Sequence, residues 1–271
     1  MARSGGGPGS YPAHVTSDDA DLGEELVRLA SADNFRDVAG PGHRTADGRR
    51  LRRGVLFRSN ELTLTHEDAQ ALAALGVETI FDLRDAHEVE AHPDAPVPGA
   101  TWRHVEVKGI PMEAVASLQT REQGLAVMGE VYRGFVEKEG GRAAFGELLH
   151  AIAAGQGTQV FHCTAGKDRT GWASVLLLHV VGVAPGTILA DYLATNTISS
   201  ATREKYLGMV RQHLGADKVE VYETVMVADE DYLQQAYDAV RSSYGSMEGY
   251  LREGLGLGPD TLAGLRARLV D

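Results

Sequence analysis

The stretch that decides the fold is His162-Cys163-Thr164-Ala165-Gly166-Lys167-Asp168-Arg169-Thr170-Gly171. A short apolar run ending at Phe161 leads into it, and a long apolar run over 172–181 leads out of it. This pattern predicts a strand, a tight loop and a helix, with Cys163 at the end of the strand and Arg169 six residues later. Backbone N–H groups of the loop and the helix N-terminus then converge on one point and form an anion site.

Two side chains of this loop have the chemistry of phosphate-ester hydrolysis. A thiolate at Cys163 is stabilised by the anion site and can attack phosphorus to form a phosphocysteine, which water then hydrolyses. The guanidinium of Arg169 matches two phosphate oxygens and their transition-state charge. A lone cysteine is otherwise a small buried hydrophobe, but ionisable residues surround this one. Because Cys163 is the only cysteine, a disulfide framework and a cysteine-rich zinc site are both excluded.

The other residues of the loop are expected either to contact the phosphate or to hold the loop in its conformation. We expect phosphate to contact Thr164, Ala165, Gly166, Lys167, Asp168 and Arg169. Gly166 permits the sharp curvature of the loop, and Thr170 is placed to donate its hydroxyl to the sulfur. His162 points away if Cys163 points in, so it is expected to hold the loop through hydrogen bonds rather than to transfer protons.

For three charged residues the sequence leaves two possible roles open. Asp168 either transfers a proton to or from the reacting oxygens or forms a salt bridge that aims Arg169. Lys167 either contacts a second phosphate or is a solvated lysine. Asp82, at the end of an apolar run, either transfers protons or anchors loop backbone.

Composition bounds the class of protein. The 271 residues are 43% hydrophobic and 24% charged, which is ordinary for a globular domain. A net charge of −12 argues against a nucleic-acid partner, and no apolar run predicts stable membrane insertion. The first residues lack the apolar core of a signal peptide, so we expect a cytoplasmic protein with a disordered tail over 1–20 and one domain over 21–271.

Periodicity predicts an α/β fold. Strands are expected at 55–57, 77–83 and 101–107 and between Gly157 and Cys163, and a hairpin turn at Asp47-Gly48. Helices are expected at 65–75, 122–137, 142–153, 172–181, 185–194, 202–214, 231–244, 247–255 and 259–269, and a helical turn at 87–91. Residues 22–30 read as a short helix or the approach to a strand. This order predicts a central, mostly parallel sheet flanked by helices, with the loop at a strand's carboxyl end.

The loop resembles the signature of cysteine-based protein tyrosine phosphatases, Cys-x5-Arg-Thr, and more closely that of an atypical bacterial branch of that family. Further segments agree with this branch: Asn34-Phe35-Arg36-Asp37, Leu56-Phe57-Arg58-Ser59, Asp82-Leu83-Arg84, Tyr244-Gly245-Ser246 and Tyr250-Leu251. The resemblance spans about residues 31–270. It implies hydrolysis of phosphotyrosine, often with phosphoserine, phosphothreonine and phosphoinositides, no metal or other cofactor, and a helical lid from about 200 to 255. Asn34, Arg36, Asp37 and Arg58 either pack around the loop or are surface residues of a turn.

The resemblance also bears on the general acid. Many cysteine phosphatases carry an acidic Asp some thirty to forty residues before the cysteine, yet no Asp occurs between Ala95 and His162. Asp168 is therefore the first candidate, as in myotubularin-like phosphatases, and Asp82 is the second.

Other functions fit the sequence less well. A nucleotide-binding P-loop is rejected because Phe161 and Asp168 stand where it needs Gly and Ser or Thr. A rhodanese-like sulfurtransferase leaves Arg169 unexplained, and a phosphate-binding pseudophosphatase is disfavoured because Cys163 and Arg169 are both present. A phosphoinositide phosphatase using the same site stays open: Lys167 and Asp168 suit an inositol headgroup, while the acidic net charge opposes it. The expected partner is thus a phosphorylated protein or a phosphoinositide.

Overall fold

The computed structural model describes residues 27–271. Their centre is a five-stranded sheet with the strand order β1-β2-β5-β3-β4. The strands are β1 (Arg36–Asp37), β2 (Leu56–Ser59), β3 (Val77–Asp82), β4 (Thr101–His104) and β5 (Thr158–His162). β1 pairs antiparallel with β2, and the other neighbours pair in parallel. The predicted α/β class with a mostly parallel sheet is confirmed.

The central strands carry apolar side chains on both faces, because each face of the sheet packs against its own hydrophobic core. Adjacent residues of a strand point to opposite faces. Phe57, Ile80 and Val160 belong to the smaller core, and Leu56, Phe81 and Phe161 belong to the larger one.

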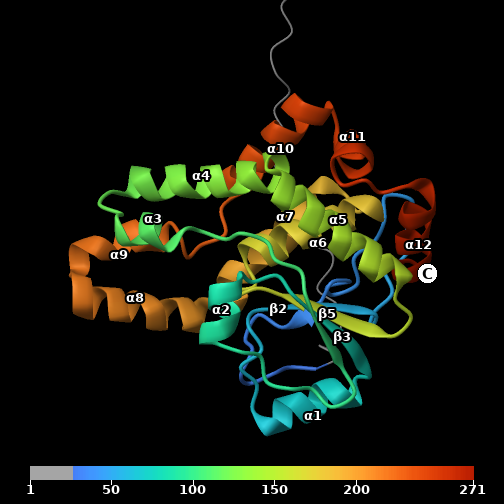
Figure 1. The fold of residues 1–271 in the computed structure, drawn as a ribbon, viewed down its shortest axis with the longest axis horizontal. Coiled ribbons are helices and arrows are strands. Elements are labelled where there is room, and N and C mark those ends of the chain that lie inside the picture. Colours follow the sequence, from blue (N-terminus) through green and yellow to red (C-terminus); the bar gives the residue numbers. More distant parts are fainter. Residues whose placement is uncertain (1–26) are drawn as a thin grey trace, which may run out of the picture.

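Helices cover the two faces unequally (Figure 1). α1 (His66–Ala74) lies against the smaller core, and it begins as predicted after Thr65, whose hydroxyl accepts the N–H of Asp68 at 3.2 Å. The larger core is covered by α4 (Arg121–Glu137), α5 (Glu139–Ala154), α6 (Asp168–Val180), α7 (Pro185–Ile198), α10 (Glu230–Tyr244) and α12 (Pro259–Leu269).

The remaining elements are short or peripheral. They are α2 (Ala86–Ala91), α3 (Met112–Ala116), α8 (Ser200–Leu214), η1 (Ala216–Lys218), α9 (Val219–Glu223), α11 (Met247–Gly249) and η2 (Tyr250–Gly254). α8 extends away from the sheet, and α9 brings the chain back against α4 (Figure 1). None of the described helices has the length and apolarity needed to cross a membrane.

Some predicted boundaries were wrong. α6 begins at Asp168 rather than at Trp172, because the loop turns directly into the helix. β4 ends at His104, three residues early. The turn at Asp47-Gly48 is present, closed by a bridge between Arg44 and Arg50. The predicted tail over 1–20 lies outside the described residues, and 27–30 form neither helix nor strand.

The parallel register determines where a site can form. Ser59 and Asp82 both pair with His162, so β2, β3 and β5 end at one level. The residues that follow these strands therefore gather at one edge of the sheet, and Cys163 lies in the middle of that edge.

Candidate active site

The loop between β5 and α6 has one glycine that cannot be replaced without strain. Gly166 has φ +66°, a conformation that favours glycine. A Cβ atom there would lie 2.6 Å from both the Asn34 side-chain amide and the Ser59 carbonyl oxygen. The predicted role of Gly166 in the curvature of the loop is thus supported by its backbone and by its surroundings.

Side chains and backbone outside the loop orient its peptide groups. The Thr164 carbonyl accepts the N–H of Glu61 at 3.0 Å, the Ala165 carbonyl accepts the Asn34 amide at 2.9 Å, and the Gly166 carbonyl accepts Asn34 and Arg58 at 3.0 Å each. In a trans peptide the C=O and the following N–H point in opposite directions. The N–H groups of residues 165–167 are therefore turned away from these donors, toward the concave side of the loop, where they can bind an anion.

A buried ion pair holds the donor Arg58. Its side chain is fully buried, and Nη1 lies 3.0 Å from Oδ2 of Asp191 on α7. Burial works to raise the pKa of Asp191, but hydrogen bonding and the charges of Arg36 and Arg58 outweigh it and hold that pKa well below its usual range. Asn34 and Arg58 thus contact the loop directly, and Arg36 supports them through hydrogen bonds to Asn34 and to Thr195 on α7. Asp37 does neither: its carboxylate accepts N–H groups of the turns at 39 and 54.

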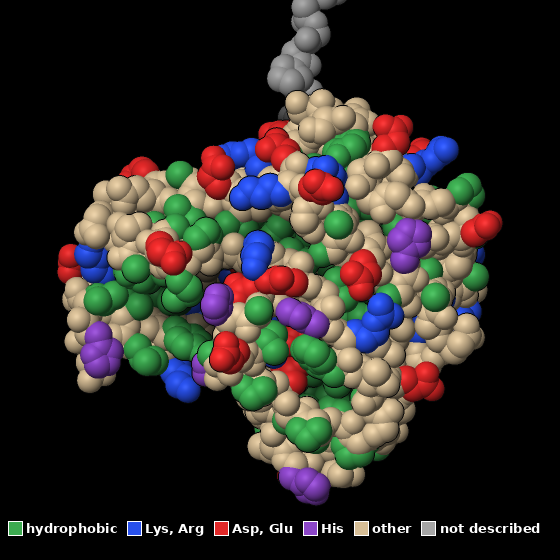
Figure 2. Space-filling view, viewed as in Figure 1, with side chains coloured by type: hydrophobic (Ala, Val, Ile, Leu, Met, Phe, Trp, Pro, Cys, Tyr) green, Lys and Arg blue, Asp and Glu red, His purple; other side chains and the backbone are tan. Residues whose placement is uncertain are grey.

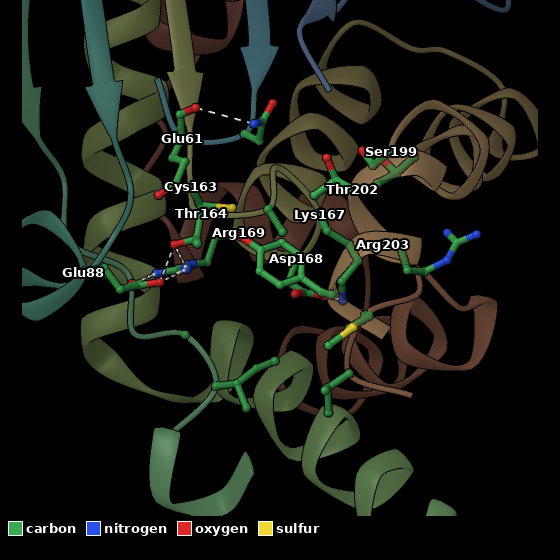
Figure 3. A pocket seen from close by; sticks show the side chains of 18 of the residues that line it. Glu61, Glu88, Cys163, Thr164, Lys167, Asp168, Arg169, Ser199, Thr202 and Arg203 are labelled. Carbon is green, nitrogen blue, oxygen red and sulfur yellow. Dashed lines mark hydrogen bonds and ion pairs between the residues drawn. The ribbon is translucent and has the colours of Figure 1, made fainter. Parts of the chain in front are cut away.

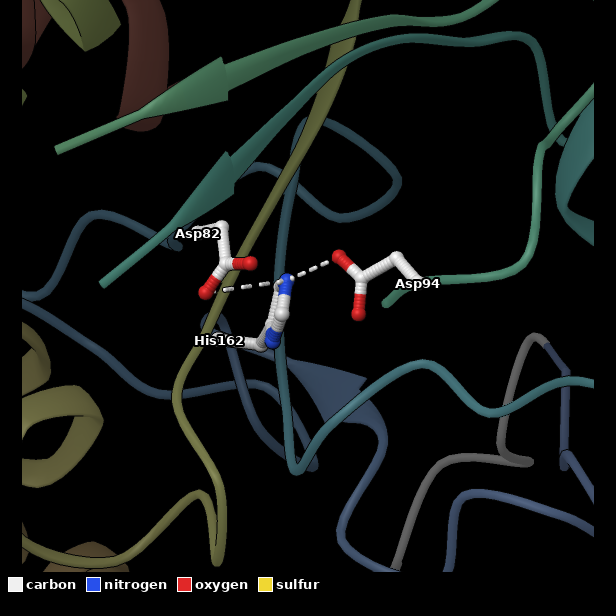
Figure 4. A group of neighbouring side chains, drawn as sticks. All are labelled: Asp82, Asp94 and His162. Atoms are coloured by element: carbon white, nitrogen blue, oxygen red, sulfur yellow. Dashed lines mark ion pairs between the residues drawn. The ribbon is translucent and has the colours of Figure 1, made fainter. Parts of the chain in front are cut away.

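A second charged cluster supports the loop from the other side (Figure 4). His162 is fully buried, with Nε2 2.8 Å from Asp94 and 3.9 Å from Asp82. Arg84 donates from Nη2 to both carboxylates, at 2.8 Å to Asp82 and 2.7 Å to Asp94. The guanidinium already bonds to one oxygen of each acid and would repel a cation beside them, so the three ligand-type side chains are a poor site for a divalent cation.

The structure separates the two predicted proton-transfer candidates. Asp82 is fully buried, accepts the N–H and guanidinium of Arg84, and does not line the pocket. This geometry matches the prediction that Asp82 anchors backbone, and it argues against Asp82 as the general acid. His162, whose Nδ1 lies 3.4 Å from the carbonyl of Cys163, likewise has a supporting position, as predicted.

Glu88 on α2 orients Arg169 (Figure 3). The guanidinium donates through Nη1 at 2.6 Å and Nη2 at 2.8 Å to the two carboxylate oxygens, and the Thr164 hydroxyl donates to the same carboxylate. Burial works to raise the pKa of Glu88, but the hydrogen bonds and charge of Arg169 outweigh it and lower that pKa to about 2. Glu88 is itself fixed at the start of α2, where Oε2 accepts the N–H of Asp85 at 2.9 Å.

Asp168 is held by two donors at one oxygen. Nζ of Lys167 lies 2.6 Å from Oδ1, and the hydroxyl of Tyr132 on α4 donates to the same atom at 3.0 Å. Lys167 is only 3% exposed, so the solvated-lysine alternative is wrong. Asp168 makes no salt bridge to Arg169 among the described contacts, because Glu88 fills that role.

Thr170 departs from the prediction in one respect. Its hydroxyl is buried and makes no hydrogen bond to another described residue, so the predicted donation to the sulfur is absent from this structure. Cys163 is itself only 2% exposed and lines the pocket.

The loop forms the floor of a pocket of about 290 Å³. One wall is apolar and includes Ile110, Met112, Val115, Val131, Val225 and Met226; the α8 side carries Thr202, Arg203 and Tyr206. Hydrophobic side chains also gather on the outer surface over α3, α4 and α9 (Figure 2). The pocket therefore offers an apolar wall beside an anion site, which suits an aryl phosphate.

Only part of the predicted lid segment, about residues 200–255, lies at the pocket. Within that segment, the residues that line the pocket come from α8 and from the turn after α9. α10 packs along α4 and buries Tyr232, Leu233 and Ala236, so extending the lid to residue 255 was wrong. Thr202 ties α8 to the loop before β1 through a hydrogen bond to Asp33.

Sequence reasoning missed the residues that hold the loop from a distance: Glu88, Asp94, Tyr132, Asp191 and Tyr192. Each lies far from the loop in the sequence, on a helix or, for Asp94, in the segment between α2 and β4, and joins the site only through the tertiary fold. The only local signal was the acidic residue four positions after Arg84 on a predicted helical turn.

The chain is similar to several known proteins. Residues 27–271 match the model of a tyrosine phosphatase family. The chain is 31% identical to the triple specificity protein phosphatase PtpB of Mycobacterium tuberculosis, over 83% of this chain and 92% of that protein. It is 32% identical to a putative tyrosine-protein phosphatase of Cupriavidus necator, over 86% of this chain and 85% of that protein. A solved structure, P. aeruginosa TpbA, aligns with a TM-score of 0.33 and 16% identity, covering 80% of this chain and 96% of that one.

Proposed function

Because the chain belongs to the tyrosine phosphatase family, we propose that it hydrolyses phosphotyrosine in proteins, and also phosphoserine and phosphothreonine, through a phosphocysteine at Cys163. The observation that carries this proposal is that Cys163, Asp168 and Arg169 line one pocket whose opposite wall is apolar. The reaction needs no metal, since Arg169 and the loop N–H groups supply the positive field that phosphoryl transfer requires.

The proposed chemistry has two steps. In the first, Sγ of Cys163 bonds to phosphorus while the bond from phosphorus to the leaving oxygen breaks, and protonated Asp168 gives its proton to that oxygen. In the second, water bonds to phosphorus and the S–P bond breaks, while the Asp168 carboxylate takes a proton from the water. Both steps keep the phosphoryl oxygens against Arg169.

The test is hydrolysis of p-nitrophenyl phosphate and of a phosphotyrosyl peptide with a chelator in excess. We expect full activity in the wild type and none in Cys163→Ser, with inorganic phosphate still binding to the variant. A phosphoenzyme trapped by acid quench and mapped to Cys163 would support the intermediate. Activity that requires added metal, or that survives in Cys163→Ser, contradicts the proposal.

A phosphoinositide is the second candidate substrate. Arg203 on α8 lines the pocket together with Lys167, so two cations beyond Arg169 border the space where a further phosphate would lie. We expect Arg203→Ala to lower the rate on a bisphosphorylated inositol lipid several-fold more than the rate on a phosphotyrosyl peptide. Equal losses on both substrates would remove the reason for this second candidate.

A further inference from the structure

A line of hydroxyl groups leads from the core of the molecule to Asp168. Tyr132 is fully buried on α4, and its hydroxyl donates to Oδ1 of Asp168 at 3.0 Å. The hydroxyl of Tyr192 on α7 lies 2.7 Å from that of Tyr132.

The direction of these bonds follows from proton counting. A phenol has one proton, and Tyr132 uses it in the bond to Asp168, so Tyr192 is the donor in the pair of hydroxyls. Burial, together with the neighbouring Asp168 charge, raises the pKa of Tyr132 well above its ordinary value. The phenol is thus a neutral donor throughout the working range of the protein.

The two oxygens of Asp168 are not equivalent. Oδ1 accepts both Nζ of Lys167 and the hydroxyl of Tyr132, whereas no hydrogen bond from another described residue reaches Oδ2. A proton carried by Asp168 therefore belongs on Oδ2, the oxygen left for exchange with substrate and water. A carboxyl without the two donors would be free to rotate and present either oxygen.

We propose that Tyr132, backed by Tyr192, is a positioning residue that occupies Oδ1 of Asp168 and so reserves Oδ2 for proton transfer. This inference rests on the proposed function, in which Asp168 is the proton donor to the leaving oxygen. The aromatic ring of Tyr132 has a separate packing role beside Phe135 and Tyr232, which a phenylalanine would keep. Removing only the hydroxyl therefore isolates the contact to Asp168.

The experiment compares two leaving groups in Tyr132→Phe. Phenyl phosphate has a strongly basic leaving oxygen that needs a proton, whereas p-nitrophenyl phosphate has a weakly basic one that needs little. General acid catalysis contributes about 10²–10⁴-fold in total, and loss of positioning forfeits a part of it. We expect kcat/KM to fall about tenfold for phenyl phosphate and less than about threefold for p-nitrophenyl phosphate. The inhibition constant of inorganic phosphate should not change.

Two further variants separate positioning from structure. Tyr192→Phe should give the same selective loss at a smaller size, because it acts one bond further away. Tyr250→Phe is the matched control: this fully buried tyrosine donates to the Phe135 carbonyl at 3.2 Å and does not touch Asp168. Its effect should be the same on both substrates.

The decisive measurement is the double variant with Asp168→Asn. Tyr132→Phe should add nothing to the loss on phenyl phosphate in that background, since the group it positions is already gone. Additive losses, or equal losses on the two substrates, would overturn the positioning role. If Asp168→Asn alone leaves the ratio of the two substrates unchanged, then the proposed proton donor itself is wrong, a result distinguishable from failure of the tyrosine contact alone.

Discussion

Replacing Glu88 by glutamine tests how strongly the phosphate-binding arginine is held. The variant keeps the shape of the side chain and an oxygen for the N–H of Asp85, but it removes the charge paired with Arg169 at 2.6 and 2.8 Å. The pKa of Glu88 falls from the ordinary 4.5 to about 2. This difference of about 2.5 units, at 1.36 kcal/mol per unit, corresponds to about 3.4 kcal/mol.

The value must be reduced for solvent, because the Glu88 side chain is 29% exposed. We therefore expect Glu88→Gln to lower the free energy of unfolding by about 2 kcal/mol at pH 7. The folded pKa is depressed, so this stabilisation is fully present above pH 4.5 and is lost as the pH falls through about 2. The difference between wild type and variant should accordingly be constant from pH 6 to 7 and shrink below pH 4.5.

Urea denaturation of both proteins across this pH range measures the effect. Glu147→Gln is the matched control, because Glu147 pairs with Arg103 at 3.4 Å with both side chains about half exposed. Its effect should stay below about 0.5 kcal/mol. A loss in Glu88→Gln that equals the control, or that does not vary between pH 7 and pH 3, would refute the assignment of a strong ion pair.

Three further substitutions probe the support of the loop. Gly166→Ala should destabilise the protein by at least about 2 kcal/mol and abolish phosphate binding, because its Cβ would meet backbone at 2.6 Å; thermal unfolding and calorimetric titration check this. Gly109→Ala places a Cβ 3.0 Å from Cζ of Arg169, so KM for p-nitrophenyl phosphate should rise several-fold while the melting temperature changes little; an unchanged KM would show that the guanidinium has room to move. Asp191→Asn leaves the buried Arg58 without its anion and should cost about 3–5 kcal/mol in chemical denaturation, and a loss under about 1 kcal/mol would contradict the pairing.

The sequence predicted the parts of the site that are contiguous in the chain. Cys163, Gly166 and Arg169 could be interpreted because loop, nucleophile and cation stand within seven residues and follow a strand. Glu88 lies 81 positions from Arg169, and nothing local relates the two. The spacing of Tyr132 predicts only a residue on the apolar face of a helix. The contact of its hydroxyl with Asp168 depends on the tertiary fold, which brings α4 to the first residue of α6.

The predicted lid segment extended too far, to about residue 255, for a related reason. α8 and α10 both have helical spacing, and an amphipathic pattern does not state which surface receives the apolar face. In the fold, α10 finds that surface on α4, whereas α8 keeps Tyr206 and Met209 about half exposed. Only tertiary packing separates a helix of the core from a helix of the pocket wall.

The two guanidinium groups beneath the loop have a consequence for engineering. Arg58 and Arg84 are fully buried, and such ion pairs often stabilise a protein less than apolar residues of the same volume would. A search for heat-resistant variants would therefore tend to replace them with leucine or methionine. The Arg58 replacement would remove a donor to the Gly166 carbonyl, and the Arg84 replacement would release the acids around His162. Resistance to heat and retention of the phosphate-binding loop thus make opposing demands on the same two positions.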